Sequence, residues 1–130
     1  MIKKIYRRLQ IFFVPGAIKK NFRLISNENK YLLAEKIKDI YIPTISSNTS
    51  EEKLLFEVQE HLESRVIVDR MRVIPWLSKN LKLENLHILE IGCGTGSSSI
   101  TLAEQGAKVV GIDIHKESLE IAKYRSEVYN

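Results

Sequence analysis

Cysteine is almost absent from this chain of 130 residues, which contains only Cys93. A single cysteine excludes a disulfide framework and a cysteine-rich zinc site within the chain, and it fits a reducing compartment. Long apolar runs are absent too, and none could span a bilayer. The apolar stretch at residues 11–14 is too short for a secretory signal, and no small-residue cleavage site follows it. The sequence therefore predicts a cytoplasmic protein.

Acidic residues are missing from residues 1–27, which carry seven lysines and arginines. Because the whole chain has a net charge of +4, the remainder carries −3, which argues against a generally basic nucleic-acid binder. Apolar residues of this basic amphipathic leader recur at helical spacing from Ile2 to Phe13. We interpret them as a helix packed on its own domain. The alternative is peripheral contact with an anionic membrane surface or an acidic partner.

Residues 28–84 have helical patterns, which a predicted loop at residues 43–50 interrupts. We expect one short helix at residues 30–41 and a longer one that runs to about Asp69. Thr49 and Glu52 have the spacing of a capping box at the start of the longer helix. Pro75 suits the first turn of a further helix, and Trp76 is expected in the core.

The pattern changes after residue 85 from helical periodicity to short apolar runs. Residues 87–91 and 108–113 predict two strands. The segment between them predicts a helix that ends at Gly106, and another helix starts at about Lys116. The predicted fold class is therefore α/β, a Rossmann-like parallel sheet unit in the order β-α-β-α, incomplete, preceded by an α-helical region.

Three glycines follow the first predicted strand at once. Gly92 allows a sharp turn, Gly94 lets a ligand approach the backbone, and Gly96 lets the next helix pack close to the strand. The first N–H groups of that helix can bind a carboxylate or a phosphate. Asp113 ends the second strand, beside the first one, where a carboxylate can accept hydrogen bonds from both hydroxyls of a ribose. Together these residues predict a nucleoside site with an anion pocket.

The sequence E-I-G-C-G-T-G at residues 90–96, with G-I-D-I at 111–114, resembles the first two motifs of the class I (Rossmann-like) S-adenosylmethionine-dependent methyltransferases. The resemblance covers about residues 86–125. An acid two residues before the first glycine, the G-x-G-x-G spacing and the second-strand acid all occur together, which makes it specific. A nicotinamide dinucleotide site is less favoured, because Ser97 stands where that fingerprint has its third glycine.

The resemblance implies S-adenosylmethionine as the cofactor and assigns roles to single residues. Backbone atoms of the loop would contact the methionyl part, Glu90 would hold its amino group, Asp113 would bind the ribose, and Ile114 would lie against the adenine. The implied cofactor-binding residues are Glu90, Gly92, Cys93, Gly94, Gly96, Asp113 and Ile114. We interpret Cys93 as a packing residue and residues 97–99 as a helix start, not as a catalytic triad.

The resemblance also implies an organisation in three segments and an enzymatic function. Residues 1–27 would be the leader, 28–84 a helical cap region, and 85–130 the start of a methyltransferase domain that continues beyond Asn130. The catalytic base and the methyl acceptor are not identified by these residues, although a small molecule is favoured. The competing hypothesis is a non-catalytic module that binds S-adenosylmethionine or a partner. His61, His87 and His115 share no ligand spacing, so no metal site is predicted.

Overall fold

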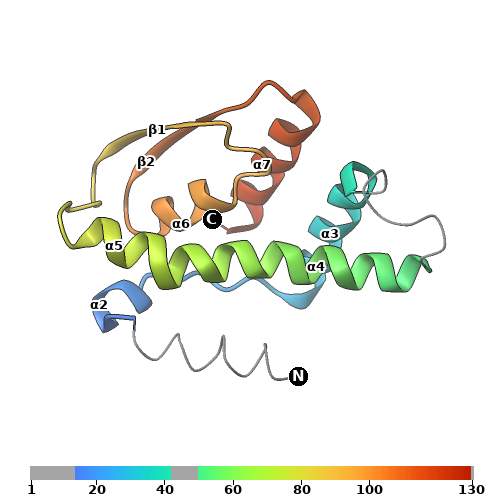
Figure 1. Ribbon diagram of the computed structural model, residues 1–130, viewed down its shortest axis with the longest axis horizontal. Helices are drawn as coiled ribbons and strands as arrows, with labels where there is room; N and C mark the ends of the chain where they lie inside the picture. Colours follow the sequence, from blue (N-terminus) through green and yellow to red (C-terminus); the bar gives the residue numbers. More distant parts are fainter. Residues whose placement is uncertain (1–13, 42–49, 130) are drawn as a thin grey trace.

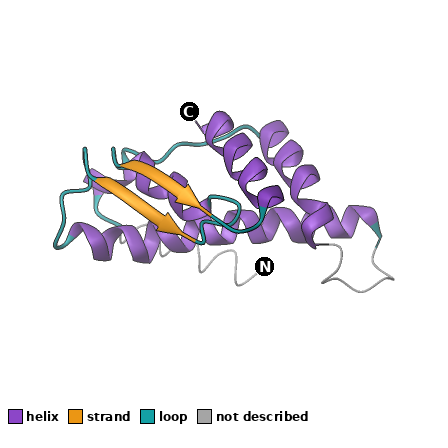
Figure 2. Ribbon diagram, turned by 90° about the horizontal axis from the view of Figure 1, so that it is seen from above, coloured by secondary structure: helices purple, strands orange, loops and turns teal. Residues whose placement is uncertain are grey.

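The structure is a computed structural model that describes residues 14–41 and 50–129 (Figures 1 and 2). The predicted helix over residues 2–13 lies outside the described residues. The described elements are α2 (Gly16–Lys19), α3 (Asn27–Tyr41), α4 (Glu51–Val68), the π-helical turn η2 (Asp69–Val73), α5 (Ile74–Ser78), β1 (His87–Ile91), α6 (Ser97–Glu104), β2 (Lys108–Ile112) and α7 (Lys116–Tyr129).

The two strands form a parallel sheet in which His87 pairs with Lys108 and Ile91 pairs with Ile112. Helix α6 connects the strands, and the long rod of α4, η2 and α5 runs beneath them (Figure 1). The predicted α/β fold class is confirmed: the described part of the chain is a two-stranded parallel unit preceded by helices. Because the strands are parallel, their carboxyl ends lie together, and this brings the glycine loop next to Asp113.

Two clusters of buried side chains hold the elements together. One joins the amino-terminal segment to the sheet unit and consists of Val14, Ile18, Ile74, Leu83, Leu102 and Ala107. The other lies where α3, α4 and α7 meet and consists of Leu33, Ala34, Ile37, Val58, Leu62 and Ile121. Half-buried Ile88 and Val109 pack on the first cluster, so one face of the sheet is covered by helices. Leu89 and Val110 of the opposite face are exposed.

The predicted capping box at Thr49 is wrong. Helix α4 begins at Glu51, and Ser50 is its N-cap, with extended backbone angles and a hydroxyl that accepts a hydrogen bond from the Lys53 N–H at 3.4 Å. Since Lys53 now holds the third helical position, Glu52 is one position too early to reach back to the cap. Ser50 offers the same hydroxyl chemistry as Thr49 one residue later, and the sequence alone did not distinguish them.

Substitution of Ser50 by alanine is expected to lower the free energy of unfolding by about 1 kcal/mol, because an N–H of the first turn loses its acceptor. Urea denaturation of both proteins measures this difference. Ser126→Ala is the matched control, since the Ser126 hydroxyl bonds only to the exposed carbonyl of Lys123 inside α7. Equal losses for the two variants would contradict the assignment of Ser50 as the cap.

Trp76 is not in the core, contrary to the prediction. Its side chain is 64% exposed, whereas Ile74 is 0% exposed. Two residues advance a helix by roughly 200°, so burial of Ile74 turns Trp76 to the outside. Pro75 does lie in the first turn of α5, as predicted. The π-helical turn η2 joins α4 to α5, and the apolar pattern of the sequence gave no sign of it.

A buried ion pair joins the segment before α3 to η2 and α6. The Nε and Nη2 atoms of Arg70 donate to the carboxylate of Glu104, whose side chain is 1% exposed. The same carboxylate accepts the Arg23 N–H at 3.0 Å, and the Arg23 carbonyl accepts a bond from Arg70 at 2.6 Å. The Arg70 guanidinium also stacks over Phe22 at 4.8 Å. Breaking such a pair is strongly destabilising, so it fixes these three segments to one another.

Candidate functional site

The glycine loop between β1 and α6 is held by the end of the neighbouring strand. The N–H groups of Gly92 and Cys93 both donate to the Ile112 carbonyl, at 2.8 Å and 3.0 Å. Gly92, Gly94 and Gly96 all have positive φ angles, between 52° and 79°. The loop therefore turns sharply off β1 while β2 fixes its position, as the glycine spacing predicts.

Asp113 lies where the loop and the end of β2 meet. One carboxylate oxygen accepts the Gly94 N–H at 2.8 Å, and the other accepts the His115 N–H at 2.9 Å. These bonds, first that of His115 and then that of Gly94, hold the pKa of the carboxyl below its ordinary value. A carboxylate offers about four acceptor positions. Acceptor positions that these bonds do not use can accept the hydroxyls of a ribose.

An open hollow of about 490 Å³ lies beside this carboxylate. Its walls are mainly apolar and consist of Ile91, Gly92, Ile112, Asp113, Ile114 and His115. Ile114 is 93% exposed and has no packing role that would account for an isoleucine there. A flat apolar ring system can lie against such a surface. The hollow therefore combines an apolar wall with a carboxylate at its edge.

Glu90 lies on the face of the sheet turned toward α6. Its carboxylate accepts a hydrogen bond from the Ser99 hydroxyl of α6. This contact fixes the carboxylate beneath the loop and leaves further acceptor positions open. The predicted role of Glu90 in holding an amino group stays a prediction.

Cys93 packs beneath the loop against Gly111 of β2. Its side chain is 7% exposed, and a Cβ built on Gly111 would lie 2.9 Å from the sulfur. Burial raises the pKa of the thiol, and the nearby Glu90 and Asp113 carboxylates raise it further. A buried, protonated thiol is a poor nucleophile, so the geometry favours the packing role.

The three consecutive serines that open α6 each bond to a different element. The Ser97 hydroxyl accepts from Arg125 of α7 at 2.8 Å, and Ser98 donates to Asp69 of η2 at 2.9 Å. Ser99 donates to Glu90 of β1, as described above. These bonds account for all three hydroxyls by helix anchoring and agree with the interpretation of residues 97–99 as a helix start.

Arg125 is a site residue that sequence reasoning missed. It is 0% exposed, and besides Ser97 its guanidinium donates to the Thr95 hydroxyl at 3.3 Å. The two contacts lie on either side of Gly96, at the start of α6. No local pattern predicts them, because 28 and 30 residues separate Arg125 from its partners.

Comparison with protein families finds a match for this arrangement. Residues 82–128 match a family model described as a methyltransferase domain. This segment includes both strands, the glycine loop and Asp113. This segment of the chain is therefore similar to methyltransferase domains.

Curated relatives are similar to the chain over part of its length. The cypemycin N-terminal methyltransferase of a Streptomyces species is 43% identical over 49 residues, which are 38% of this chain and 20% of that protein. Ubiquinone biosynthesis O-methyltransferases of Leptothrix cholodnii and Pelagibacter ubique are 41% and 42% identical over 49 and 50 residues, or 37% and 38% of this chain. Each match covers 21% of that relative. The chain thus spans about a fifth of the length of these relatives. No solved structure matches the chain at a significant level.

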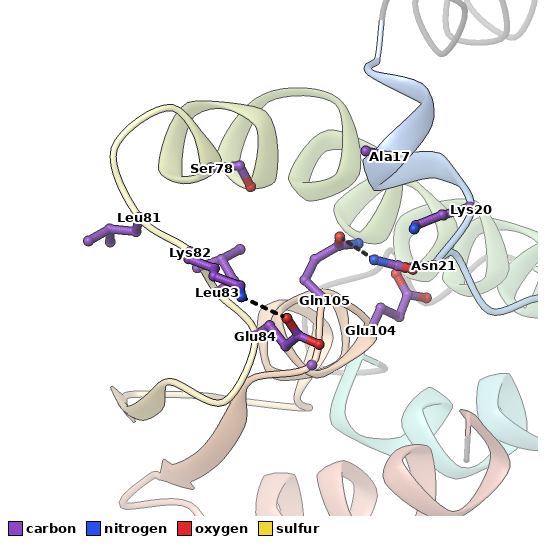
Figure 3. A pocket seen from close by; sticks show the side chains of 11 residues that line it. Ala17, Lys20, Asn21, Ser78, Leu81, Lys82, Leu83, Glu84, Glu104 and Gln105 are labelled. Carbon is purple, nitrogen blue, oxygen red and sulfur yellow. Dashed lines mark hydrogen bonds and ion pairs between the residues drawn. The ribbon is translucent and has the colours of Figure 1, made fainter.

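A second hollow, of about 470 Å³, lies at the opposite end of the strands, near Gly106 (Figure 3). Several of its polar side chains have partners within the protein. Asn21 donates to Gln105 at 3.0 Å, and Lys82 lies 3.2 Å from Glu84. The first contact joins the segment after α2 to the end of α6, and the Asn85 N–H donates to the Gly106 carbonyl at 2.8 Å, so we interpret this hollow as structural.

No group of three or more histidine, cysteine, aspartate or glutamate side chains that could hold a metal ion occurs among residues 14–41 and 50–129. His61 lies on α4, His87 begins β1, and His115 follows β2. His61 is partly buried, which lowers its pKa, and the positive charges of Arg65 and Arg125 lower it further. The three histidines thus lie on separate elements.

Proposed function

We propose that this protein binds S-adenosylmethionine at the carboxyl ends of β1 and β2 and is a methyltransferase. The observation that carries the proposal is the Asp113 carboxylate. It is held by the Gly94 and His115 N–H groups at 2.8 Å and 2.9 Å, beside an apolar hollow. The carboxylate has acceptor positions that these two bonds do not use. A ribose with two free hydroxyls fits this arrangement, and an adenine fits the wall that Ile114 forms.

The remaining contacts follow from the loop. We propose that the backbone of Gly92, Cys93 and Gly94 contacts the methionyl part, and that Glu90 binds its amino group. The positive φ angles of Gly92 and Gly94 hold the loop open, and a Cβ at either position would meet no atom within 4 Å. This space on the ligand side is what a close backbone approach needs. Gly96 is the exception, because it faces α7.

The cofactor supplies a methyl group on a sulfonium, which leaves as a neutral thioether. The described residues bind and orient this donor, and such positioning can account for a large part of the rate. We propose a small molecule as the acceptor. Support comes from the ubiquinone biosynthesis O-methyltransferases among the relatives. The cypemycin enzyme shares the same segment, so the segment supports a common cofactor, and the acceptor would be recognised elsewhere.

We also propose a cytoplasmic protein. For residues 1–27, packing on the same domain stays our interpretation, and peripheral contact with an anionic surface is the alternative, which the run of seven basic residues without an acid supports. Among the residues that the structure describes, no helix has the length and the apolar character needed to cross a membrane.

Isothermal titration with S-adenosylhomocysteine and with NADH tests the cofactor assignment. We expect binding of S-adenosylhomocysteine and none of NADH; the reverse would contradict the proposal. Incubation with a tritiated methyl donor and cell extract then tests transfer. The label should enter the small-molecule fraction, and label confined to protein or RNA would contradict the proposed acceptor class.

A further inference from the structure

Trp76 is the only tryptophan of the chain, and the proposed function does not use it. Its side chain is 64% exposed, although tryptophan is highly buried on average. Ile74 and Leu77 take up the inner side of α5, where they belong to or pack on the first buried cluster. Val73, three residues before Trp76, is exposed as well. The outer face of α5 therefore presents an indole and an aliphatic side chain to solvent.

Two cations flank this apolar pair. Arg72 comes four residues before Trp76 and Lys79 three residues after it, so all three lie on one face of the helix. Both cations are exposed. Within residues 14–41 and 50–129, neither cation forms an ion pair with an acidic side chain. We name Arg72, Val73, Trp76 and Lys79 together the α5 surface.

The neighbourhood of the α5 surface is basic too. Residues 70–83 contain four basic residues and no acid. Of these four, Arg70 is buried and Lys82 is paired with Glu84 at 3.2 Å. Helix α2 packs on α5 through the first buried cluster (Figure 1), and the exposed Lys20 follows it directly. This end of the molecule therefore carries positive charge around an exposed indole.

Charge and apolar character together fit the interface of an anionic lipid membrane. An indole has an apolar body and one N–H donor, and tryptophan is enriched at the boundary between headgroups and acyl chains. Each basic side chain near an anionic membrane surface strengthens binding about fivefold. A second copy of this chain fits less well, because two α5 surfaces face to face would bring like charges together. A nucleic acid would leave Val73 without an apolar partner.

We propose that the α5 surface docks the protein on an anionic lipid membrane, with Trp76 at the level of the headgroups. The inference depends neither on methyl transfer nor on residues 1–27. Ser78 of α5 lines the hollow near Gly106, whereas the hollow beside Asp113 lies at the opposite end of the strands. The docking surface and the proposed cofactor site are therefore separate.

The fluorescence of Trp76 tests the inference directly, because no other tryptophan of the chain contributes to the signal. The protein is titrated with vesicles of phosphatidylcholine and phosphatidylserine, and with vesicles of phosphatidylcholine alone. With the anionic vesicles, the emission of Trp76 should move to shorter wavelength, and added salt should reverse the shift. Vesicles of phosphatidylcholine alone should leave the emission unchanged.

Co-sedimentation with the same anionic vesicles measures the contribution of single side chains. Trp76→Ala should weaken binding about tenfold, because the membrane loses an apolar anchor, and Lys79→Ala should weaken it about fivefold. Phe56→Ala is the matched control for the aromatic side chain, since Phe56 is 58% exposed on α4 beside an exposed acid, Glu57. Lys123→Ala, at an exposed position of α7, is the control for the charge. Both controls should bind as the unchanged protein does.

All four substitutions replace partly or fully exposed side chains, and circular dichroism checks that each variant is folded. Vesicle binding without a change in Trp76 emission would place the contact elsewhere on the protein and overturn the inference. Equal binding to both kinds of vesicle, or no binding to either, would overturn it too. So would a Trp76 shift that a DNA duplex produces and anionic vesicles do not, or a shift that follows protein concentration without vesicles.

Discussion

Replacement of Asp113 by alanine is expected to lower the affinity for S-adenosylhomocysteine by about a hundredfold. Two ribose hydroxyls would each lose a bond to a charged acceptor, and each such bond contributes about a factor of ten. The N–H groups of Gly94 and His115 would also lose their acceptor, which loosens the loop. Isothermal titration of the two proteins measures the change.

Asp113→Asn and Glu117→Ala refine this experiment. Asparagine keeps the shape of the side chain and one acceptor oxygen. The affinity of Asp113→Asn should therefore lie between those of the unchanged protein and of Asp113→Ala. Glu117 is an exposed acid in the first turn of α7, and its loss should leave the affinity unchanged. The Asp113 pKa is lowered. Its carboxylate therefore keeps its negative charge at every pH above the ordinary aspartate pKa, and only stronger acid removes this charge. Unchanged affinity in Asp113→Ala would contradict the ribose assignment.

Replacement of Gly96 by alanine is expected to lower the free energy of unfolding by about 2–4 kcal/mol. Gly96 has a φ angle of 79°, which residues other than glycine rarely adopt. An added Cβ would also lie 3.0 Å from the Ala122 Cβ and 3.2 Å from its Cα. The second atom is backbone, so α7 would have to move away from the start of α6. Urea denaturation measures the loss.

Two further variants separate these causes. Ala122→Gly in the Gly96→Ala background removes the Cβ contact and should restore part of the loss, while the φ strain stays. Gly16→Ala is the control at a position with no atom within 4 Å of the new Cβ, and it should be nearly neutral. A loss for Gly96→Ala as small as that for Gly16→Ala would contradict the close packing of α6 on α7.

The sequence predicts the strand-loop-helix unit well because its signals are local. The change of period after residue 85, the glycine spacing and the acid after the second strand each lie within a few residues. The structure confirms both strands, the left-handed backbone at Gly106 and the approach of Asp113 to the loop. These features depend on backbone geometry that only certain residue types adopt, so they can be recognised in one chain.

The features that the sequence did not predict depend on contacts between distant residues or on which of two neighbouring residues takes a given position. Arg125 reaches Thr95 and Ser97 only because α7 packs on α6, and nothing near residue 125 indicates this. Trp76 was expected inside because it is apolar, but burial of Ile74 decides which side of α5 faces the core. Thr49 was predicted as the N-cap of α4, but Ser50 takes this position, because either of the two neighbouring hydroxyls could cap the helix.

The most direct measurement of the cofactor site is an NMR titration of the ¹⁵N-labelled protein with S-adenosylhomocysteine. The account predicts that the largest amide shifts occur at Gly92, Cys93, Gly94 and Ile114, around the carboxyl ends of the strands. The amide of Gly106, beside the hollow at the opposite end, should barely change. Shifts that gather around Gly106, or no shifts at all at saturating ligand, would contradict a cofactor site between the glycine loop and Asp113.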